Sequence, residues 1–144
     1  EFTIFKIRTM TKNTPELGTH DVDKSFQLRI GKIIRAIKLD ELPQLINVLK
    51  GDINLVGPRP GLVTQDDLQK ERHKRNIFIV KPGITGLAQI LGYDMSDPAK
   101  LAEIDRIYID NQTIYLNTVI LLGTFISSFR HKVSMKLGIE IRER

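Results

Sequence analysis

Two adjacent carboxylates, Asp40 and Glu41, stand at the expected start of a helix, and an arginine between two prolines, Arg59, follows in the next loop. One carboxylate of such a pair can attack phosphorus while the other holds Mg²⁺, which prefers hard oxygen ligands alongside substrate phosphates. The guanidinium group of an arginine presents a fixed fork to phosphate oxygens. Together, these residue types favour chemistry on phosphates.

The same pair also has a purely structural interpretation. Asp40 is well placed as a helix N-cap, Glu41 complements the helix dipole in the first turn, and Pro43 is tolerated there. Arg59 in a Pro/Gly loop can equally be a surface residue. The residues alone leave both interpretations open.

The elements that must position these groups follow from hydrophobic periodicity and from turn residues. Alternation over 2–10 predicts a half-buried strand, which would place Lys6 and Arg8 on one face. A loop is expected over 11–23, a Pro/Gly loop over 57–61, a short strand over 77–80, and a short strand or turn over 86–92. Helices are expected over five ranges: 26–37, 41–50 (ending at Gly51), 64–76, 98–111 and 114–129.

Composition describes an ordinary globular chain. Its 144 residues fit one domain (1–144), with 27% charged and 41% hydrophobic residues. A net charge of +5 is compatible with an anionic partner or with a solvated basic surface. The absence of cysteine excludes disulfides and thiolate metal sites.

No uninterrupted apolar run reaches the roughly 18 residues that would span a bilayer. The nearest approach, 114–126, is interrupted by Asn117 and Thr118, which favours a buried or interfacial helix. Because the first residue is Glu1 and not Met, we expect a fragment or a processed product.

Four ordered blocks resemble the bacterial sugar transferases, the monotopic polyprenyl-phosphate phosphoglycosyl transferases. These blocks are Phe5-Lys6-Ile7-Arg8-Thr9-Met10, Leu39 to Asp52 with the following Gly57-Pro58-Arg59-Pro60, Lys81 to Gln89, and Asp105-Arg106-Ile107-Tyr108-Ile109. The resemblance covers nearly the whole chain. It implies an α/β (α+β), helix-rich single domain with a small sheet or hairpin, in a membrane-associated monotopic architecture on the cytoplasmic face of the membrane.

The resemblance also implies a reaction. In this family the Asp of the dyad forms a covalent phosphosugar intermediate and the Glu binds Mg²⁺, positions that match Asp40 and Glu41. The donor is a UDP-sugar, UMP leaves, and polyprenyl phosphate accepts the phosphosugar. This would be the first membrane step in making an exopolysaccharide, capsule, O-antigen or glycoprotein glycan. Six further residues are implied in substrate binding: Lys6, Arg8, Arg35, Arg59, Gln89 and Asp105.

The chain departs from the family pattern at three places. Tyr93 follows the Gln89 block where many members carry an arginine that helps to bind the donor, and Asn117 stands where many have Asp. The N-terminal membrane helix of the family would precede Glu1.

Two other classes of function remain open. The chain could be an inactive fragment that acts as a basic membrane-peripheral or nucleotide-binding module. A nucleic-acid-binding role is disfavoured, because aromatic residues are only 6% and the usual motifs are missing. The three histidines have no metal-ligand spacing, and the sequence leaves the oligomeric state open, a homodimer included.

Overall fold

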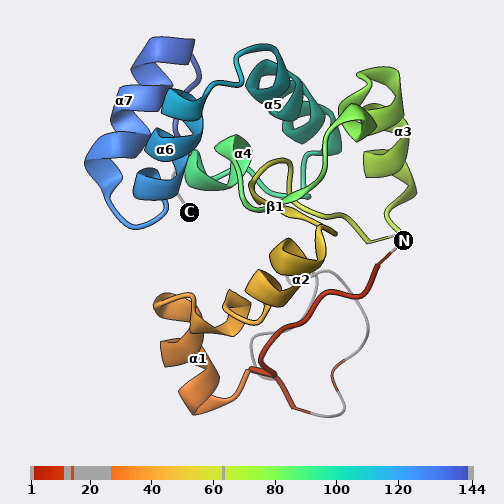
Figure 1. Cartoon of the computed structure of the whole chain (residues 1–144), viewed down its shortest axis with the longest axis vertical. Coiled ribbons are helices and arrows are strands. Elements are labelled where there is room, and N and C mark those ends of the chain that lie inside the picture. The colour runs from red at the N-terminus through yellow and green to blue at the C-terminus, as the bar shows by residue number, and fades with distance from the viewer. Residues whose placement is uncertain (1, 12–13, 15–26, 63, 143–144) are drawn as a thin grey trace. The chain divides into compact units, whose positions relative to one another are not determined.

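The computed structural model describes residues 2–11, 14, 27–62 and 64–142 (Figure 1). The chain divides into two compact units, Glu1–Asp52 and Ile53–Arg144. The helix-rich α/β fold with a small sheet that the sequence predicts is confirmed. The assignment of the whole chain to one domain stays a prediction, and the two units are described in turn.

The first unit is built from short helices, and the range 41–50, predicted as one helix, is shared between two of them. The helices are α1 (Arg29–Ala36), the 3₁₀ helix η2 (Leu39–Glu41) and α2 (Gln44–Lys50). Gly51 ends α2 in the left-handed conformation at φ 79°, as the predicted glycine cap requires. The loop expected over 11–23 and the predicted start of the first helix at Phe26 lie outside the described residues, apart from 11 and 14.

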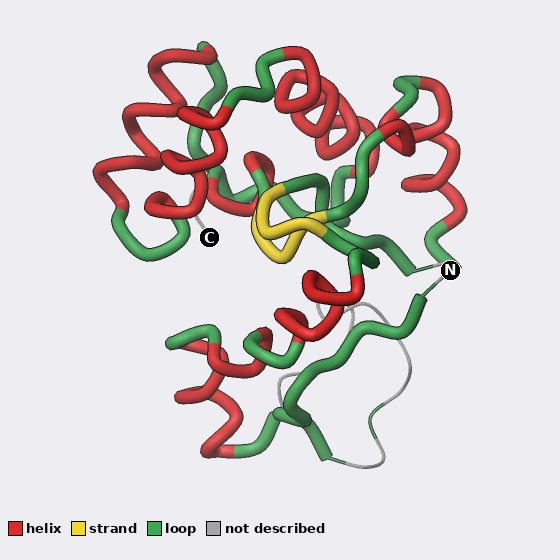
Figure 2. Tube along the Cα trace, viewed as in Figure 1, coloured by secondary structure: helices red, strands yellow, loops and turns green. Residues whose placement is uncertain are grey.

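The predicted strand over 2–10 is wrong. Figure 2 shows this segment as an extended loop, and its one ladder contact among the described residues is an isolated antiparallel bridge between Met10 and Gln27. Its backbone instead forms single hydrogen bonds with backbone groups in or next to the short helices. Ile7 N–H donates to Asp40 O at 3.0 Å, and Leu28 N–H donates to Thr9 O at 3.1 Å. The alternation of apolar and polar residues over 2–10 therefore predicts the extended conformation correctly, but it does not predict whether the segment pairs in a sheet.

The second unit contains a small parallel sheet and most of the helices. In chain order its elements are β1 (Asn54–Val56), α3 (Asp66–Lys74), η3 (Ile77–Ile79), β2 (Gly83–Thr85), α4 (Leu87–Ile90), α5 (Pro98–Asp110), α6 (Ile114–Gly123) and α7 (Ser127–Leu137). The two strands pair in parallel with Asn54 opposite Gly83 and Val56 opposite Thr85. A parallel pair needs a crossover connection, which α3 and η3 supply.

The hydrophobic core of this unit joins β1 to the helices. Leu68 of α3, Leu87 of α4, Ile104 of α5 and Ile120 of α6 are all buried in one cluster with Val56 of β1. Helix α5 begins as its sequence predicts, with Pro98 in the first turn and the Asp97 carboxylate accepting from Lys100 N–H at 3.0 Å. The core thus fixes α3 and α5 around the strand that leads into the Arg59 loop.

Two short segments differ from their predicted form. Residues 77–80 are predicted as a strand, but Ile77–Ile79 forms the 3₁₀ helix η3 after Asn76, which is left-handed at φ 54°. Asparagine is one of the few residues that visits this conformation readily. Residues 86–92, predicted as a strand or turn, contain the short helix α4.

The helix predicted over 114–129 is interrupted, so that α6 and α7 form two helices that pack side by side (Figure 1). The side chain of Arg130 explains the break, because its Nε donates to Gly123 O at 2.6 Å and its Nη2 donates to Thr124 O at 3.3 Å. These carbonyls end α6 and have no helical partner of their own. Within the described residues, no helix has the length and apolar character needed to cross a bilayer.

Candidate active site

The Asp-Glu pair lies within η2 and not at the N-terminus of a regular helix. Lys38, left-handed at φ 57°, turns the chain into this 3₁₀ helix. The predicted role of Asp40 as a helix N-cap is wrong, because α2 begins at Gln44 and its N-cap position is occupied by Pro43. Asp40 is nevertheless 96% covered, with a relative exposure of 4%. A buried carboxylate that does not cap a helix needs another partner.

That partner is Lys6, from the extended N-terminal segment. Its Nζ lies 3.1 Å from Asp40 Oδ2 and 3.8 Å from Glu41 Oε1. One ammonium group therefore bridges both carboxylates of the pair. The structure therefore brings together three of the residues that the sequence analysis singled out, an acidic pair and a partly exposed lysine that contacts both of its carboxylates.

Asn47 of α2 holds the segment that carries Lys6. Its Oδ1 accepts from Phe5 N–H at 3.1 Å, and its Nδ2 donates to Thr3 O at 2.7 Å and to Asp52 Oδ2 at 3.1 Å. Asn47 is completely buried. Sequence reasoning missed this residue, although an amide on the inner face of a short helix signals a polar partner inside the fold.

The other two predicted cations of this unit have different surroundings. Arg35, in the last turn of α1, donates from Nε to Thr9 Oγ1 at 2.7 Å, so it anchors the far end of the same segment. Arg8 is exposed and has no ion-pair or hydrogen-bond partner among the described residues. The Gly31 backbone comes so close to Thr9 that an added Cβ would lie 2.4 Å from Thr9 O.

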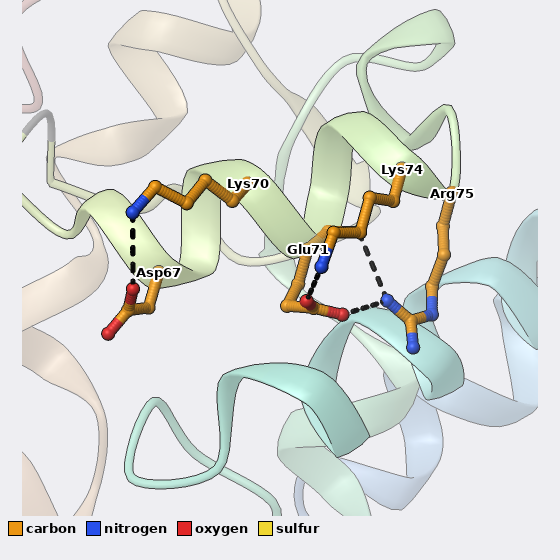
Figure 3. Close-up of polar contacts among 5 residues, drawn as sticks. All are labelled: Asp67, Lys70, Glu71, Lys74 and Arg75. Carbon is orange, nitrogen blue, oxygen red and sulfur yellow. Dashed lines mark hydrogen bonds and ion pairs between the residues drawn. The ribbon is translucent and has the colours of Figure 1, made fainter.

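Helix α3 of the second unit carries its charges on two distinct faces. Figure 3 shows the outer face, where Lys70 lies 3.6 Å from Asp67, and Lys74 and Arg75 both contact Glu71. Hydrogen bonds from Lys74 and Arg75 lower the pKa of the Glu71 carboxyl below its ordinary value. These pairs, at spacings of three and four residues, stabilise a surface helix and suggest no ligand.

The inner face of α3 presents Arg72, one helical turn after the buried Leu68. Its Nη2 and Nε lie 2.7 and 3.1 Å from Asp105 Oδ2, and its Nη1 donates to Arg59 O at 2.8 Å. Burial raises the pKa of the Asp105 carboxyl, and the Arg72 guanidinium opposes that shift. Sequence reasoning assigned no role to Arg72, which lies in the helix predicted over 64–76. The signal was its spacing of four from Leu68.

The remaining predicted positions of the second unit lie near the sheet. Gln89 donates from Nε2 to Ile84 O at 3.3 Å, while its Oε1 is buried without a hydrogen-bond partner in the described part of the chain. Asn117 accepts from the Tyr108 hydroxyl at 2.9 Å. Tyr93 is half-buried against the core. Asn117 therefore has a structural partner that accounts for it without a ligand.

The acidic pair can act as a nucleophile or as an oxygen donor to a hard cation, and the arginines can bind phosphate. No cluster of three or more acidic or histidine side chains suited to a metal occurs among residues 2–11, 14, 27–62 and 64–142. Mg²⁺ commonly takes only one or two carboxylates together with substrate phosphates, and the Asp40–Glu41 donor set fits that pattern.

Comparison with known proteins identifies the family of this chain. The profile described as bacterial sugar transferase matches residues 1–131. The chain therefore belongs to the bacterial sugar transferase family, as the motif resemblance predicts.

Individual relatives carry more specific names. The chain is 45% identical over 139 residues to EpsL of Bacillus subtilis, named as an uncharacterized sugar transferase, with 96% of this chain and 66% of that protein covered. It is 40% identical over 137 residues to the UDP-N-acetylgalactosamine-undecaprenyl-phosphate N-acetylgalactosaminephosphotransferase of Aeromonas hydrophila, with 86% and 31% covered. It is 35% identical over 141 residues to the undecaprenyl-phosphate galactose phosphotransferase of Salmonella typhimurium, with 85% and 29% covered. The chain thus spans about two thirds of the first protein and about a third of the other two.

Proposed function

We propose that this protein transfers a sugar 1-phosphate from a UDP-sugar to polyprenyl phosphate and releases UMP. The observation that carries the proposal is the buried Asp40 beside Glu41, with the Lys6 ammonium group close to both carboxylates. Relatives named as undecaprenyl-phosphate sugar phosphotransferases support the reaction class.

Asp40 is the proposed nucleophile. A carboxylate oxygen of Asp40 forms a bond to the phosphorus that bears the sugar, and the bond from that phosphorus to the bridging oxygen breaks, so that UMP leaves with the electron pair. A phosphate oxygen of the polyprenyl phosphate then attacks the same phosphorus. The bond to Asp40 breaks and the carboxylate is regenerated. Such covalent catalysis divides one difficult displacement into two easier ones.

Glu41 is the proposed protein ligand of Mg²⁺. When bound, the metal would offset the charge that builds up on the phosphate oxygens. Lys6 offsets part of the negative charge of the acidic pair and so helps an anionic diphosphate to approach the two carboxylates. Arg8, Arg35 and Arg59 are the proposed phosphate contacts, because guanidinium groups match the geometry of phosphate oxygens. Gln89 is the proposed contact to the UDP-sugar, since its buried Oε1 accepts no hydrogen bond from the described part of the chain.

The exposed apolar side chains of the protein support its placement on a membrane. We propose that it lies on the cytoplasmic face of that membrane. In the described part of 2–52, the buried residues are Thr9, Gly31, Asp40, Gln44 and Asn47, while large apolar side chains such as Leu49 (88%) are exposed. Exposed apolar side chains can enter a lipid interface.

Helices α6 and α7 of the second unit also expose large apolar side chains, here with lysines nearby. Ile114 and Met135 are exposed at 88% and 79%, and Lys132 and Lys136 lie 5.7 and 4.8 Å from the ring centre of Tyr115. Apolar side chains flanked by cations suit an interface with anionic headgroups.

The deciding experiment measures UMP release from a panel of UDP-sugars. The protein is solubilised in detergent from the membranes of the cells that produce it and is supplied with polyprenyl phosphate. We expect release from one or a few donors that stops with EDTA and with Asp40→Asn. The matched control is Asp67→Asn, which removes an exposed carboxylate on α3. Release that survives Asp40→Asn, or no release from any donor, would refute the proposal.

A further inference from the structure

The buried pair of Arg72 and Asp105 is a costly arrangement, and the proposed reaction gives neither residue a chemical step, although the family resemblance implies Asp105 in substrate binding. Their side chains are only 4% and 3% exposed, and the guanidinium contacts Asp105 Oδ2 through both Nη2 and Nε. Replacing such a buried ion pair by well-packed apolar residues is often neutral or even stabilising. Stability alone therefore gives a weak reason for placing two charges in this core.

The third contact of the guanidinium points to a different reason. Nη1 of Arg72 donates to the backbone carbonyl of Arg59 at 2.8 Å. The Arg72 side chain thus connects Asp105 on α5 with the residue whose guanidinium is the proposed phosphate contact. The three nitrogens of one planar group make all of these contacts, which the single ammonium of a lysine cannot reproduce.

The rest of the loop is held just as closely. The Tyr108 hydroxyl lies 3.2 Å from Val56 O, Gly57 N–H donates to Thr85 O at 2.9 Å, and Gly83 N–H donates to Pro58 O at 2.9 Å. An added Cβ at Gly57 would lie 2.7 Å from Lys81 O, so no side chain fits there without a shift. The hydrogen bond from Arg72 adds a contact to the backbone of Arg59 itself.

We propose that Arg72, oriented by Asp105, is a positioning residue that fixes the backbone at Arg59 and so presents the Arg59 guanidinium to the diphosphate of the nucleotide-sugar donor. This inference rests on the proposed function. A loop fixed before the donor arrives loses little freedom when it binds, and misplacement by about 1 Å can cost on the order of 100-fold in rate.

The test compares two changes at the pair. Arg72→Lys keeps a cation beside Asp105 but cannot also reach Arg59 O. The double variant Arg72→Met with Asp105→Leu removes both charges while keeping apolar volume in the core. We expect both to melt near the wild-type temperature and to lose about 10- to 100-fold in kcat/KM for the donor. Full activity of a folded Arg72→Lys protein would overturn the proposal.

Combination with Arg59→Ala separates positioning from general damage. If Arg72 acts through Arg59, adding Arg59→Ala to the double variant causes no further loss beyond that of Arg59→Ala alone. If the losses multiply, the pair acts by another route and the proposal fails. The matched control is Arg106→Met with Asp110→Leu, an exposed Arg–Asp pair on α5, which we expect to leave the kinetics unchanged.

A readout without turnover keeps this inference distinct from the proposed function. Hydrogen–deuterium exchange at the amides of Gly57, Arg59 and Gly61 should quicken at least 10-fold in Arg72→Lys, and donor binding measured by calorimetry should weaken. Unchanged exchange at these amides would overturn the positioning role. Faster exchange in Arg72→Lys, together with no UMP release from the wild-type protein, would refute the proposed function and leave the positioning role intact. Should the double variant fail to fold, Arg72→Lys carries the test.

Discussion

Asn47 Nδ2 lies 2.7 Å from the carbonyl oxygen of Thr3, a residue 44 positions away in the sequence. The contact begins a series in which Thr3, Phe5, Ile7 and Thr9 each use a backbone group to hold the extended segment against the helical elements. The backbone is therefore held on both sides of Lys6, at Phe5 and at Ile7, and the Lys6 side chain contacts the acidic pair. The position of this cation therefore depends on a buried amide that makes no contact with the carboxylates.

The first prediction concerns that amide. Asn47→Ala removes three hydrogen bonds and leaves Phe5 N–H and Thr3 O without their partner. We expect a loss of about 2 kcal/mol in unfolding free energy, faster hydrogen exchange at Phe5 and Ile7, and slower UMP release. Urea unfolding and exchange measured by mass spectrometry provide the readouts. Asn54→Ala, at an exposed strand position, is the control, and equal effects of the two changes would contradict the prediction.

The second prediction concerns Lys6 itself. Lys6→Met keeps the apolar stem but removes the charge that faces Asp40 and Glu41, so the two carboxylates repel an incoming diphosphate. We expect UMP release to fall by about 100-fold at saturating Mg²⁺, with Lys6→Arg retaining more activity than Lys6→Met. Lys70→Met removes an exposed lysine of α3 and should have no effect. Equal activities of Lys6→Met and Lys70→Met would show that the bridge has no role in turnover.

Part of the candidate site was predictable from the family resemblance of its motifs, although the roles of its residues stay predictions. Asp40, Glu41 and Lys6 were singled out from the sequence, and the structure places them in contact. Their local setting was not predictable, because the 3₁₀ helix depends on the left-handed Lys38, a residue type that rarely adopts this conformation. The burial of Arg72 was not predictable, since a spacing of four from a single leucine is too weak a signal.

The fold shows the same limit at its strands and helix ends. Periodicity and caps located α3, α5 and the glycine end of α2, all of which depend on local chemistry. The strands β1 and β2 contain three residues each and exist because they pair with one another, which no local pattern specifies. The break between α6 and α7 likewise depends on Arg130 folding back onto the end of α6.

The third prediction concerns the close approach of the two strands. An added Cβ at Gly83 would lie 2.1 Å from Gly57 N and 2.6 Å from the Val56 carbonyl carbon, which are backbone atoms that cannot rotate away. We expect Gly83→Ala to cost about 3 kcal/mol in unfolding free energy, since the strands must separate. Gly138→Ala is the comparison: Gly138 has open space but a φ of 64°, so only conformational strain of about 1 kcal/mol is expected. A smaller loss at Gly83 than at Gly138 in thermal or urea unfolding would contradict the tight pairing.

The last prediction uses the buried hydroxyl of Tyr108, which lies 3.2 Å from Val56 O and 2.9 Å from Asn117 Oδ1. Burial raises the pKa of this phenol above its ordinary value of 10.0. As the pH rises past about 10, the unfolded chain releases the phenolic proton while the folded protein retains it, so stability falls until the pH reaches the folded pKa. Tyr108→Phe lacks this dependence but costs about 1–2 kcal/mol at pH 7 through its lost hydrogen bonds.

The measurement is the difference in unfolding free energy between wild type and Tyr108→Phe, from urea titrations between pH 7 and pH 11. Lysines also titrate in this range, but they are common to both proteins and cancel in the difference. We expect the advantage of the wild type to shrink steadily above pH 10, because only the wild type carries the buried phenol. A difference that stays constant to pH 11 would mean that Tyr108 ionises alike in the folded and unfolded chains, and its hydroxyl would then not be held neutral at the start of the Arg59 loop.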